Sequence, residues 1–164
     1  MNVEKQNVII VDENDRIIWY KKRWTVLKSD IYRVSALLIE NSKWEFLLAQ
    51  RKFTKKNNPG QWTFSVAGTI EKWETYDSNI KKEIEEEIWI YDLKYKKIFR
   101  KRIWNKHNYY CQFYKAILDK DLDYFKIQEE EVENIRWFSV EEIKNWEFKW
   151  NEISKTLIDN LELF

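Results

Sequence analysis

The chain has 164 residues, of which 44% are hydrophobic and 35% charged, with a formal net charge of +1 and one cysteine. This suits a single domain, residues 1–164, with its own core, and it excludes an internal disulfide and gives no sign of a nucleic-acid partner or a basic membrane patch. No apolar run approaches the roughly 18 residues of a membrane span and the chain starts with polar residues rather than a signal peptide, so we expect a cytoplasmic protein with no membrane contact.

Short apolar runs separated by turn-forming residues predict strands in the first part of the chain. The runs are 7–11, 16–18, 34–39, 46–49 and 62–67. Acidic and Asn residues at 12–15 and the triplet Asn41-Ser42-Lys43 each separate two runs, so two hairpins are predicted. The polar segment 52–60 contains the only proline, Pro59, and is predicted to be a loop. We expect the strand-like run 62–67 to end at Gly68.

The clearest helix is predicted over 75–88. Thr75 can cap its start, because a threonine hydroxyl accepts a hydrogen bond from an unpaired backbone N–H in the first turn. Ile80, Ile84 and Ile88 recur at a spacing of four residues and therefore lie on one stripe, which we expect to face a core.

The second half of the chain predicts further strands and two helices. Strands are expected over 93–103, 109–118 and 135–138. Ser139 and Glu142 have the spacing of a capping box, which opens a short helix. Apolar residues at helical spacing predict a C-terminal helix over 152–163. Because strands and helices mix without strict alternation, the fold class should be α+β, or a sandwich with a mixed sheet between helices.

Three carboxylates share one face of the predicted helix. Glu83, Glu86 and Glu87 stand at i, i+3 and i+4, so they are neighbours on the helix surface. Like charges repel one another, and a hard divalent cation such as Mg²⁺ or Mn²⁺ would offset that repulsion. A glutamate cluster taken alone is more often a solvated face, so the wider sequence has to decide between the two interpretations.

The stretch from Gly68 to Ile90 resembles the Nudix box. That box is a glycine, five residues, Glu, seven residues, Arg-Glu-aliphatic, one residue, Glu-Glu, one residue and Gly-aliphatic. The first glycine, all four glutamates and both aliphatic positions match at the required spacing. Two positions depart from it, because Lys82 replaces arginine and Trp89 replaces glycine. A match of this length is far more specific than a short glycine-rich motif.

The resemblance extends over roughly residues 5–145 and is closest to the Nudix branch related to isopentenyl-diphosphate isomerases. The segments that carry it are 30–36, 47–51, 58–60, 66–68 and 137–139. It implies the Nudix α/β/α sandwich, with a mixed sheet between helices.

The resemblance implies roles for residues in and beyond the box. Glu83, Glu86 and Glu87 would bind the metal together with the backbone carbonyl of Gly68, and Glu87 or Glu86 would take a proton from water. Glu74 and Lys82 would orient the loop and the helix carboxylates. Glu131 would lie near the metal, and the alternative for Glu131 is a solvated acidic loop. A lysine lacks the planar fork of arginine, so the support from Lys82 is expected to be weaker.

The implied activity is metal-dependent hydrolysis of a diphosphate linkage in a nucleoside diphosphate derivative or a related small molecule, with Mg²⁺ or Mn²⁺ as cofactor. A first alternative is isopentenyl-diphosphate isomerisation. Those isomerases use a catalytic cysteine just before the box, where this chain reads Phe64-Ser65-Val66-Ala67. A second alternative is a non-catalytic module that only binds a nucleotide or a protein partner, although such modules usually lose metal glutamates and this chain keeps all three.

His107 and Cys111 are the chain's only histidine and cysteine, and both fall in a strand-rich aromatic region. A structural role in a strand or at its edge is the simpler interpretation for both. The aromatic residues around them could stack on a substrate ring, but alternate strand residues that face a core are the simpler and preferred explanation.

Glycine is scarce and tryptophan abundant, with 2 glycines and 10 tryptophans. Average usage predicts about 11 glycines in a chain of this length. Tryptophan stands where the box or a turn calls for glycine at Trp44, Trp73 and Trp89, and Trp19 and Trp104 also lie near turns, whereas Trp62 and Trp137 match the resemblance as tryptophan. We therefore hypothesise that UGA codons meaning glycine were translated as tryptophan. The alternative is a genuinely tryptophan-rich protein.

Overall fold

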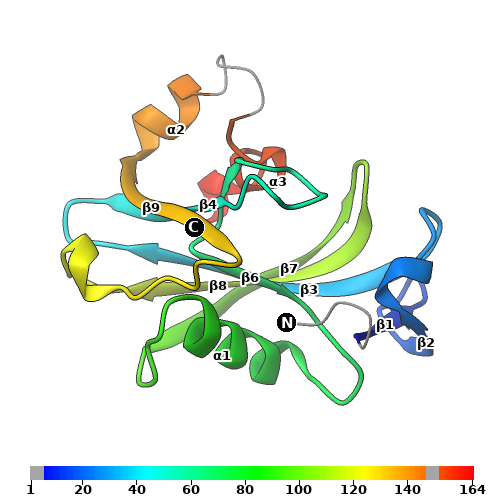
Figure 1. Cartoon of the computed structure of the whole chain (residues 1–164). Coiled ribbons are helices and arrows are strands. Elements are labelled where there is room, and N and C mark those ends of the chain that lie inside the picture. Colours follow the sequence, from blue (N-terminus) through cyan, green and yellow to red (C-terminus); the bar gives the residue numbers. More distant parts are fainter. Residues whose placement is uncertain (1–5, 147–151) are drawn as a thin grey trace.

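The computed structural model describes residues 6–146 and 152–164 (Figure 1). The strands and helices follow one another along the chain as β1 (Asn7–Val11), β2 (Ile17–Lys22), β3 (Ile31–Glu40), β4 (Glu45–Arg51), β5 (Trp62–Thr63), β6 (Val66–Thr69), α1 (Tyr76–Glu87), β7 (Tyr95–Trp104), β8 (Asn108–Ile117), β9 (Val132–Ser139), α2 (Val140–Trp146) and α3 (Lys155–Ile158).

Strand β3 is the centre of a mixed sheet. Its register with β8 is parallel along its whole length, from Tyr32 opposite Tyr109 to Glu40 opposite Ile117. On its other side β3 pairs antiparallel with β6 and, near its ends, with β1 and β4. The outer strands extend the sheet, because β2 pairs with β1, β7 with β8, and both β5 and β9 with β4.

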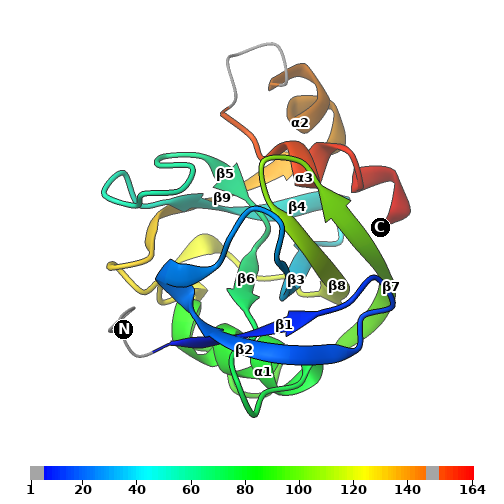
Figure 2. The same ribbon diagram turned by 90° about the vertical axis from the view of Figure 1, so that its right-hand side faces the viewer.

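Helices lie on both faces of this sheet (Figures 1 and 2). Successive residues of a strand point to opposite faces, and β3 is buried on both. Leu37 and Ile39 pack in the cluster that contains the isoleucines of α1. Ala36 and Leu38 pack in the cluster on the other face, which contains Ile143 of α2 and the C-terminal residues. The α+β sandwich expected from the sequence is therefore the observed architecture.

Helix α1 forms as its sequence predicts. The Thr75 side chain accepts from the backbone N–H of Ser78, and the Ser78 hydroxyl accepts from the backbone N–H of Thr75, which makes a reciprocal capping box. Ile80, Ile84 and Ile88 are at most 2% exposed, so this stripe fixes the helix against the sheet. The opposite side of the helix is thereby left to the charged residues.

Two predictions about element ends are wrong. Gly68 does not end its strand, because it pairs with Ser35 inside β6, and the predicted run 62–67 is divided into β5 and β6. The C-terminal helix is shorter than 152–163. Ile153 forms a parallel bridge with Trp62, which keeps the chain extended there, and only α3 and a 3-10 turn at Leu161–Leu163 follow.

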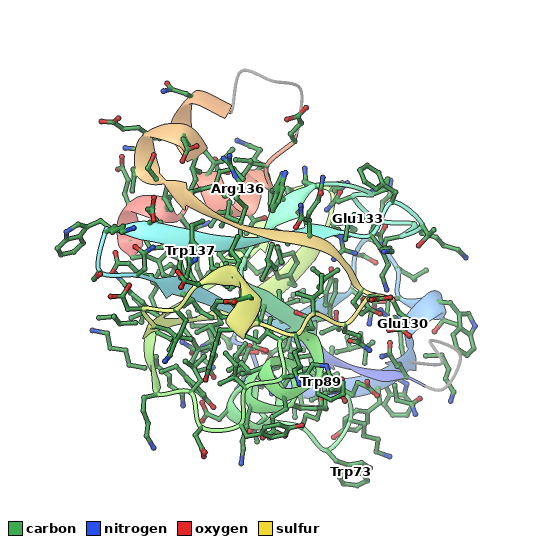
Figure 3. The ribbon with its side chains drawn as sticks, turned by 60° about the vertical axis from the view of Figure 1, so that its left-hand side comes forward. Trp73, Trp89, Glu130, Glu133, Arg136 and Trp137 are labelled. Atoms are coloured by element: carbon green, nitrogen blue, oxygen red, sulfur yellow. The ribbon has the colours of Figure 1, made fainter. Side chains whose placement is uncertain are left out.

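Three of the five tryptophans suspected of replacing glycine have a left-handed backbone. The φ angles are 63° at Trp44, 77° at Trp73 and 57° at Trp89. Trp73 projects from the periphery of the molecule (Figure 3). Trp19 and Trp104 lie in β2 and β7 and do not share this conformation, so the backbone gives no reason for glycine at those two positions.

None of the helices in the described part of the chain is long and apolar enough to cross a membrane.

Candidate active site

Strand β6 and helix α1 bring the first and last parts of the box motif together. Gly68 is buried in β6, and the carboxylate of Glu83 occupies the place that a Cβ would take at this position. Its φ is not in the left-handed region, so glycine is required here for space rather than for conformation. The absence of a side chain at Gly68 lets the helix carboxylate approach the strand backbone.

Asn79, Glu74 and Lys82 hold this carboxylate in position. The amide of the fully buried Asn79 donates to Glu83 Oε1 at 3.2 Å and to Glu74 Oε2 at 2.9 Å. Lys82 donates to Glu74 Oε1 at 2.6 Å and lies 3.5 Å from Glu83 Oε1. Asn79 also contacts the sheet through the Ser35 hydroxyl and the carbonyl of Thr69. Glu74 and Lys82 therefore belong to the same network of contacts as Glu83, and the orienting role expected for them stays a prediction.

Burial and mutual repulsion both disfavour the charged form of the carboxylates on α1. Burial raises the pKa of Glu83 to about 7, with the charges of Glu86 and Glu74 acting in the same direction and Lys82 opposing them. Burial also raises the pKa of Glu87 well above its ordinary value, and the charge of Glu83 adds to it. Buried carboxylates whose charges disfavour one another are groups that a cation would stabilise.

Lys82 places a positive charge 3.5 Å from Glu83 Oε1. Burial works against its charge, but the hydrogen bond to Glu74 and the charges of Glu83, Glu74 and Glu71 hold its pKa above the ordinary value. The ammonium therefore stays protonated and offsets part of the negative charge.

Glu87 lies between α1, β6 and the end of β4. Its Oε2 accepts from the backbone N–H of Ala67 at 3.3 Å. Glu131 and Arg51 lie close enough to act on it electrostatically, Glu131 raising and Arg51 lowering its pKa. Glu131 also forms an ion pair with Lys55, and its backbone carbonyl accepts from Lys52 N at 3.0 Å. Glu131 therefore lies close enough to Glu87 to raise its pKa, and a role for Glu131 beside a metal stays a prediction.

In the ranges 6–146 and 152–164, no three His, Cys, Asp or Glu side chains are already grouped closely enough to hold a metal ion. Glu83 is turned toward Asn79 and Lys82, whereas Glu87 is turned toward Ala67. The residues fit a cation by type, burial and shared helical face. Their carboxylates would rotate toward it on binding, since a glutamate side chain has three rotatable bonds.

A cavity of about 430 Å³ opens on the face of the sheet opposite α1. That volume is within the range of small-molecule sites. Arg51 and Ala67 line it and connect it to Glu87, although no box glutamate lines it directly. Phe64 and Tyr109 supply aromatic surface, and the polar lining includes Asn58, Gln61, Asn105, Lys106, His107 and Thr156.

Two residues of this site were not singled out by sequence reasoning. Asn79 bridges three elements, and its signal was an amide four residues before Glu83 in a helix whose other face is apolar. Arg51 ends β4, and burial lowers the pKa of its guanidinium while Glu87 and Glu131 raise it. Its position beside Glu87 depends on the folded path of the 52–60 loop, which local sequence does not encode.

The chain matches a family model and has named relatives among known proteins. The family model described as NUDIX domain matches residues 31–161. A protein named uncharacterized Nudix hydrolase PA4841, from Pseudomonas aeruginosa, is 27% identical over 139 residues, which are 80% of this chain and 77% of that protein.

Solved structures share the fold. The crystal structure of DR0079 from Deinococcus radiodurans has a TM-score of 0.85 at 16% identity and covers 96% of this chain and 98% of its own. The NUDIX domain of Shewanella oneidensis NrtR, solved in complex with ADP ribose, has a TM-score of 0.61 at 12% identity and covers 80% of this chain and 84% of its own.

Proposed function

Because this chain belongs to the NUDIX domain family and is a hydrolase of phosphoric anhydride bonds, we propose that it cleaves the diphosphate linkage of a nucleoside diphosphate derivative with the help of Mg²⁺ or Mn²⁺. The observation that supports this most strongly is the approach of Glu83 to Gly68, with Glu86 and Glu87 on the same side of α1. Arg51 and Ala67, which line the large cavity, connect it to this side of the helix through Glu87.

In this proposal Glu83, Glu86, Glu87 and the carbonyl of Gly68 hold the cation. Carboxylate and carbonyl oxygens are the ligands that both ions prefer. A cation held there would supply Lewis acid chemistry, offsetting the negative charge that develops during phosphoryl transfer. The raised pKa values of Glu83 and Glu87 fit this assignment, because a cation would remove the repulsion that contributes to them.

The protein side chains divide the remaining work. Glu87 or Glu86 accepts the proton from the attacking water, whose oxygen forms a bond to phosphorus as the bridging P–O bond breaks. Lys82 holds Glu74 and Glu83 in place, and its ammonium is a positioning group. Arg51 faces the cavity close to Glu87 and Glu131, where it would contact the substrate's phosphate oxygens. Glu131 is proposed as the additional acidic group beside the cation.

The test of this function is Glu87→Gln, which keeps the size of the side chain and removes its charge. We expect kcat to fall by about 10² to 10⁴, because general base catalysis contributes a factor of that size, while the protein remains folded. Phosphate or nucleotide release should be measured over a panel of nucleoside diphosphate derivatives with Mg²⁺. The matched control is Glu85→Gln on the same helix, where Glu85 pairs with Lys81.

The control should retain full activity. An unchanged rate in E87Q would remove Glu87 from the mechanism, and no turnover by the unaltered protein over a broad panel would count against the activity itself.

Isomerisation of isopentenyl diphosphate is a second candidate, from the branch that the sequence resembles. Cys111 lines the large cavity together with Ala67, so a thiol does lie on the substrate side of the sheet. Burial raises its pKa well above the ordinary value, which keeps it protonated and weakens it as a nucleophile. We expect no dimethylallyl diphosphate when the purified protein is given isopentenyl diphosphate, and its formation would reverse the assignment.

A binding-only module would show ligand affinity without turnover in the same panel. The presence of all three box glutamates favours catalysis over this third candidate.

A further inference from the structure

A second, smaller cavity of about 210 Å³ lies beside the large one on the same face of the sheet. Strands β3 and β6 form the floor of both. Val34 and Ala67 line the large cavity, while Tyr32 and Thr69, two residues away on the same strands, line the small one. Since alternate residues of a strand share a face, both cavities open opposite α1.

The two cavities meet at shared residues. Lys106 and His107, from the loop between β7 and β8, line both of them. Tyr32 in the small cavity stacks against Tyr109 in the large one, with ring centroids 5.4 Å apart. The two cavities therefore adjoin at the loop between β7 and β8 and at this aromatic pair.

The small cavity, which we call the basic pocket, is lined by cationic side chains and by no acidic one. Arg23 and Lys28 reach it from the segment after β2, and Lys106 and His107 complete it. Arg23 donates to the neutral oxygen Gln6 Oε1 at 2.8 Å, and Lys106 donates to the amide oxygen of Asn58. Across the described ranges, Arg23, Lys28 and Lys106 form no ion pair with a carboxylate.

These cations also act on one another. The pKa of His107 is lowered by burial and by the charges of Lys106 and Arg51, and the charge of Arg23 lowers the pKa of Arg51. Cations that converge without carboxylate partners are disfavoured by mutual repulsion, and an anion between them would remove that cost. The glutamates of α1 are the converse case, because they repel one another and a cation would remove that cost.

We propose that the basic pocket binds a phosphate group of the substrate that is additional to the diphosphate cleaved at the box. The proposal rests on the proposed function, because the cleaved linkage fixes where the substrate starts. A phosphate fits the pocket by volume, and its oxygens match the convergent donors of Arg23, Lys28 and Lys106.

The additional phosphate has two possible sources. It can belong to a longer phosphate chain, as in a nucleoside triphosphate, or to a phosphomonoester on the sugar, as in a nucleoside 3′-phosphate 5′-diphosphate. Both present the same chemistry to the pocket, so ligand comparison has to separate them.

The first experiment uses inorganic phosphate and needs neither metal nor catalysis. His107 is the only histidine, so its ring C–H signals in a proton NMR spectrum need no assignment. We expect phosphate to shift these signals saturably in the metal-free full-length protein, and the double variant R23Q/K28Q to raise the apparent Kd about tenfold or more. The matched control K94Q/K96Q removes the same charge from exposed residues that line neither cavity and should leave the Kd unchanged.

Phosphate that leaves the His107 signals unmoved overturns the proposal, and so does an equal effect of the control, which would indicate general charge attraction. Neither result depends on whether the protein hydrolyses a diphosphate.

The second experiment separates the two sources. The protein with Glu87→Gln is titrated calorimetrically with adenosine 5′-diphosphate, adenosine 5′-triphosphate and adenosine 3′-phosphate 5′-diphosphate. The ligand whose extra phosphate enters the basic pocket should bind at least tenfold more tightly than the diphosphate, and R23Q/K28Q should abolish that ratio. Equal affinity for all three ligands contradicts the proposal.

Discussion

Trp44, Trp73 and Trp89 have the left-handed backbone conformation that favours glycine, and their side chains are largely exposed. A left-handed backbone costs a residue with a Cβ roughly 1–2 kcal/mol. The three side chains are 74%, 86% and 54% exposed, so burial does not offset this cost. Trp62, by contrast, is buried and packs edge-on against Phe138 with ring centroids 5.0 Å apart. Side-chain environment therefore separates the two kinds of tryptophan that the sequence pattern distinguished.

We predict that W44G, W73G and W89G each raise the free energy of unfolding by about 1 kcal/mol. The relief of backbone strain should exceed the roughly 0.5–1 kcal/mol that glycine loses through greater freedom in the unfolded chain. Urea denaturation of the single and triple variants measures this. W62G is the control and should destabilise by about 3 kcal/mol or more, because it empties a packed site.

The gene provides a second check of the same hypothesis. Codons 44, 73 and 89 should be UGA, whereas those of Trp62 and Trp137 should be UGG. UGG at position 89, or destabilisation by W89G, would show that tryptophan is native there.

At the scale of elements, the site depends on the contacts that hold α1 against the sheet. The Asn79 side chain makes several of them, because it forms hydrogen bonds with Ser35 of β3, Thr69 of β6 and Glu83 of α1 itself. These bonds set the rotation of the helix about its axis and keep Glu83 over Gly68. The geometry of the proposed site therefore depends on a helix and two strands, including Ser35 outside the box.

We predict that N79A weakens the apparent affinity for Mg²⁺ and lowers kcat about 10- to 100-fold, the usual effect of losing a group that orients metal ligands. Activity measured against Mg²⁺ concentration should recover in part at high Mg²⁺, which a purely structural defect would not allow. N134A, at an exposed position in β9, is the control. A loss of activity that Mg²⁺ does not change would assign Asn79 to folding only.

We predict that binding of Mg²⁺ raises the free energy of unfolding of the whole protein. A ligand that binds only the folded state stabilises it by about 2.7 kcal/mol at a hundredfold excess over Kd. For a protein of this size that predicts a rise in Tm of roughly 5–10 °C with saturating Mg²⁺. The rise, followed by differential scanning calorimetry, should shrink in E83Q/E87Q. NaCl at matched ionic strength tests simple screening.

If NaCl reproduces the whole shift, or the double variant keeps it, the metal assignment of this helix is wrong.

Sequence predicted the elements with local signals and missed the contacts between distant ones. The hairpins, the cap of α1 and its isoleucine stripe follow from spacing alone, and the structure confirms them. The division at Phe64-Ser65 was missed because the Ser65 hydroxyl bonds to the backbone of β3 and β4, which no local pattern reveals. The basic pocket was missed for the same reason, because Arg23 and Lys106 meet only after β3 and β8 pair.

The parallel pairing of β3 with β8 also bears on how the chain is made. Glu40 cannot meet its partner until Ile117 has been synthesised, and at about 5–20 residues per second the delay lasts several seconds. During that interval β3, one of the most apolar strands, lacks the neighbour that covers one of its edges. The nascent chain is then open to pairing with other chains, so the yield of native protein should depend on translation speed and on chaperones that bind exposed strands.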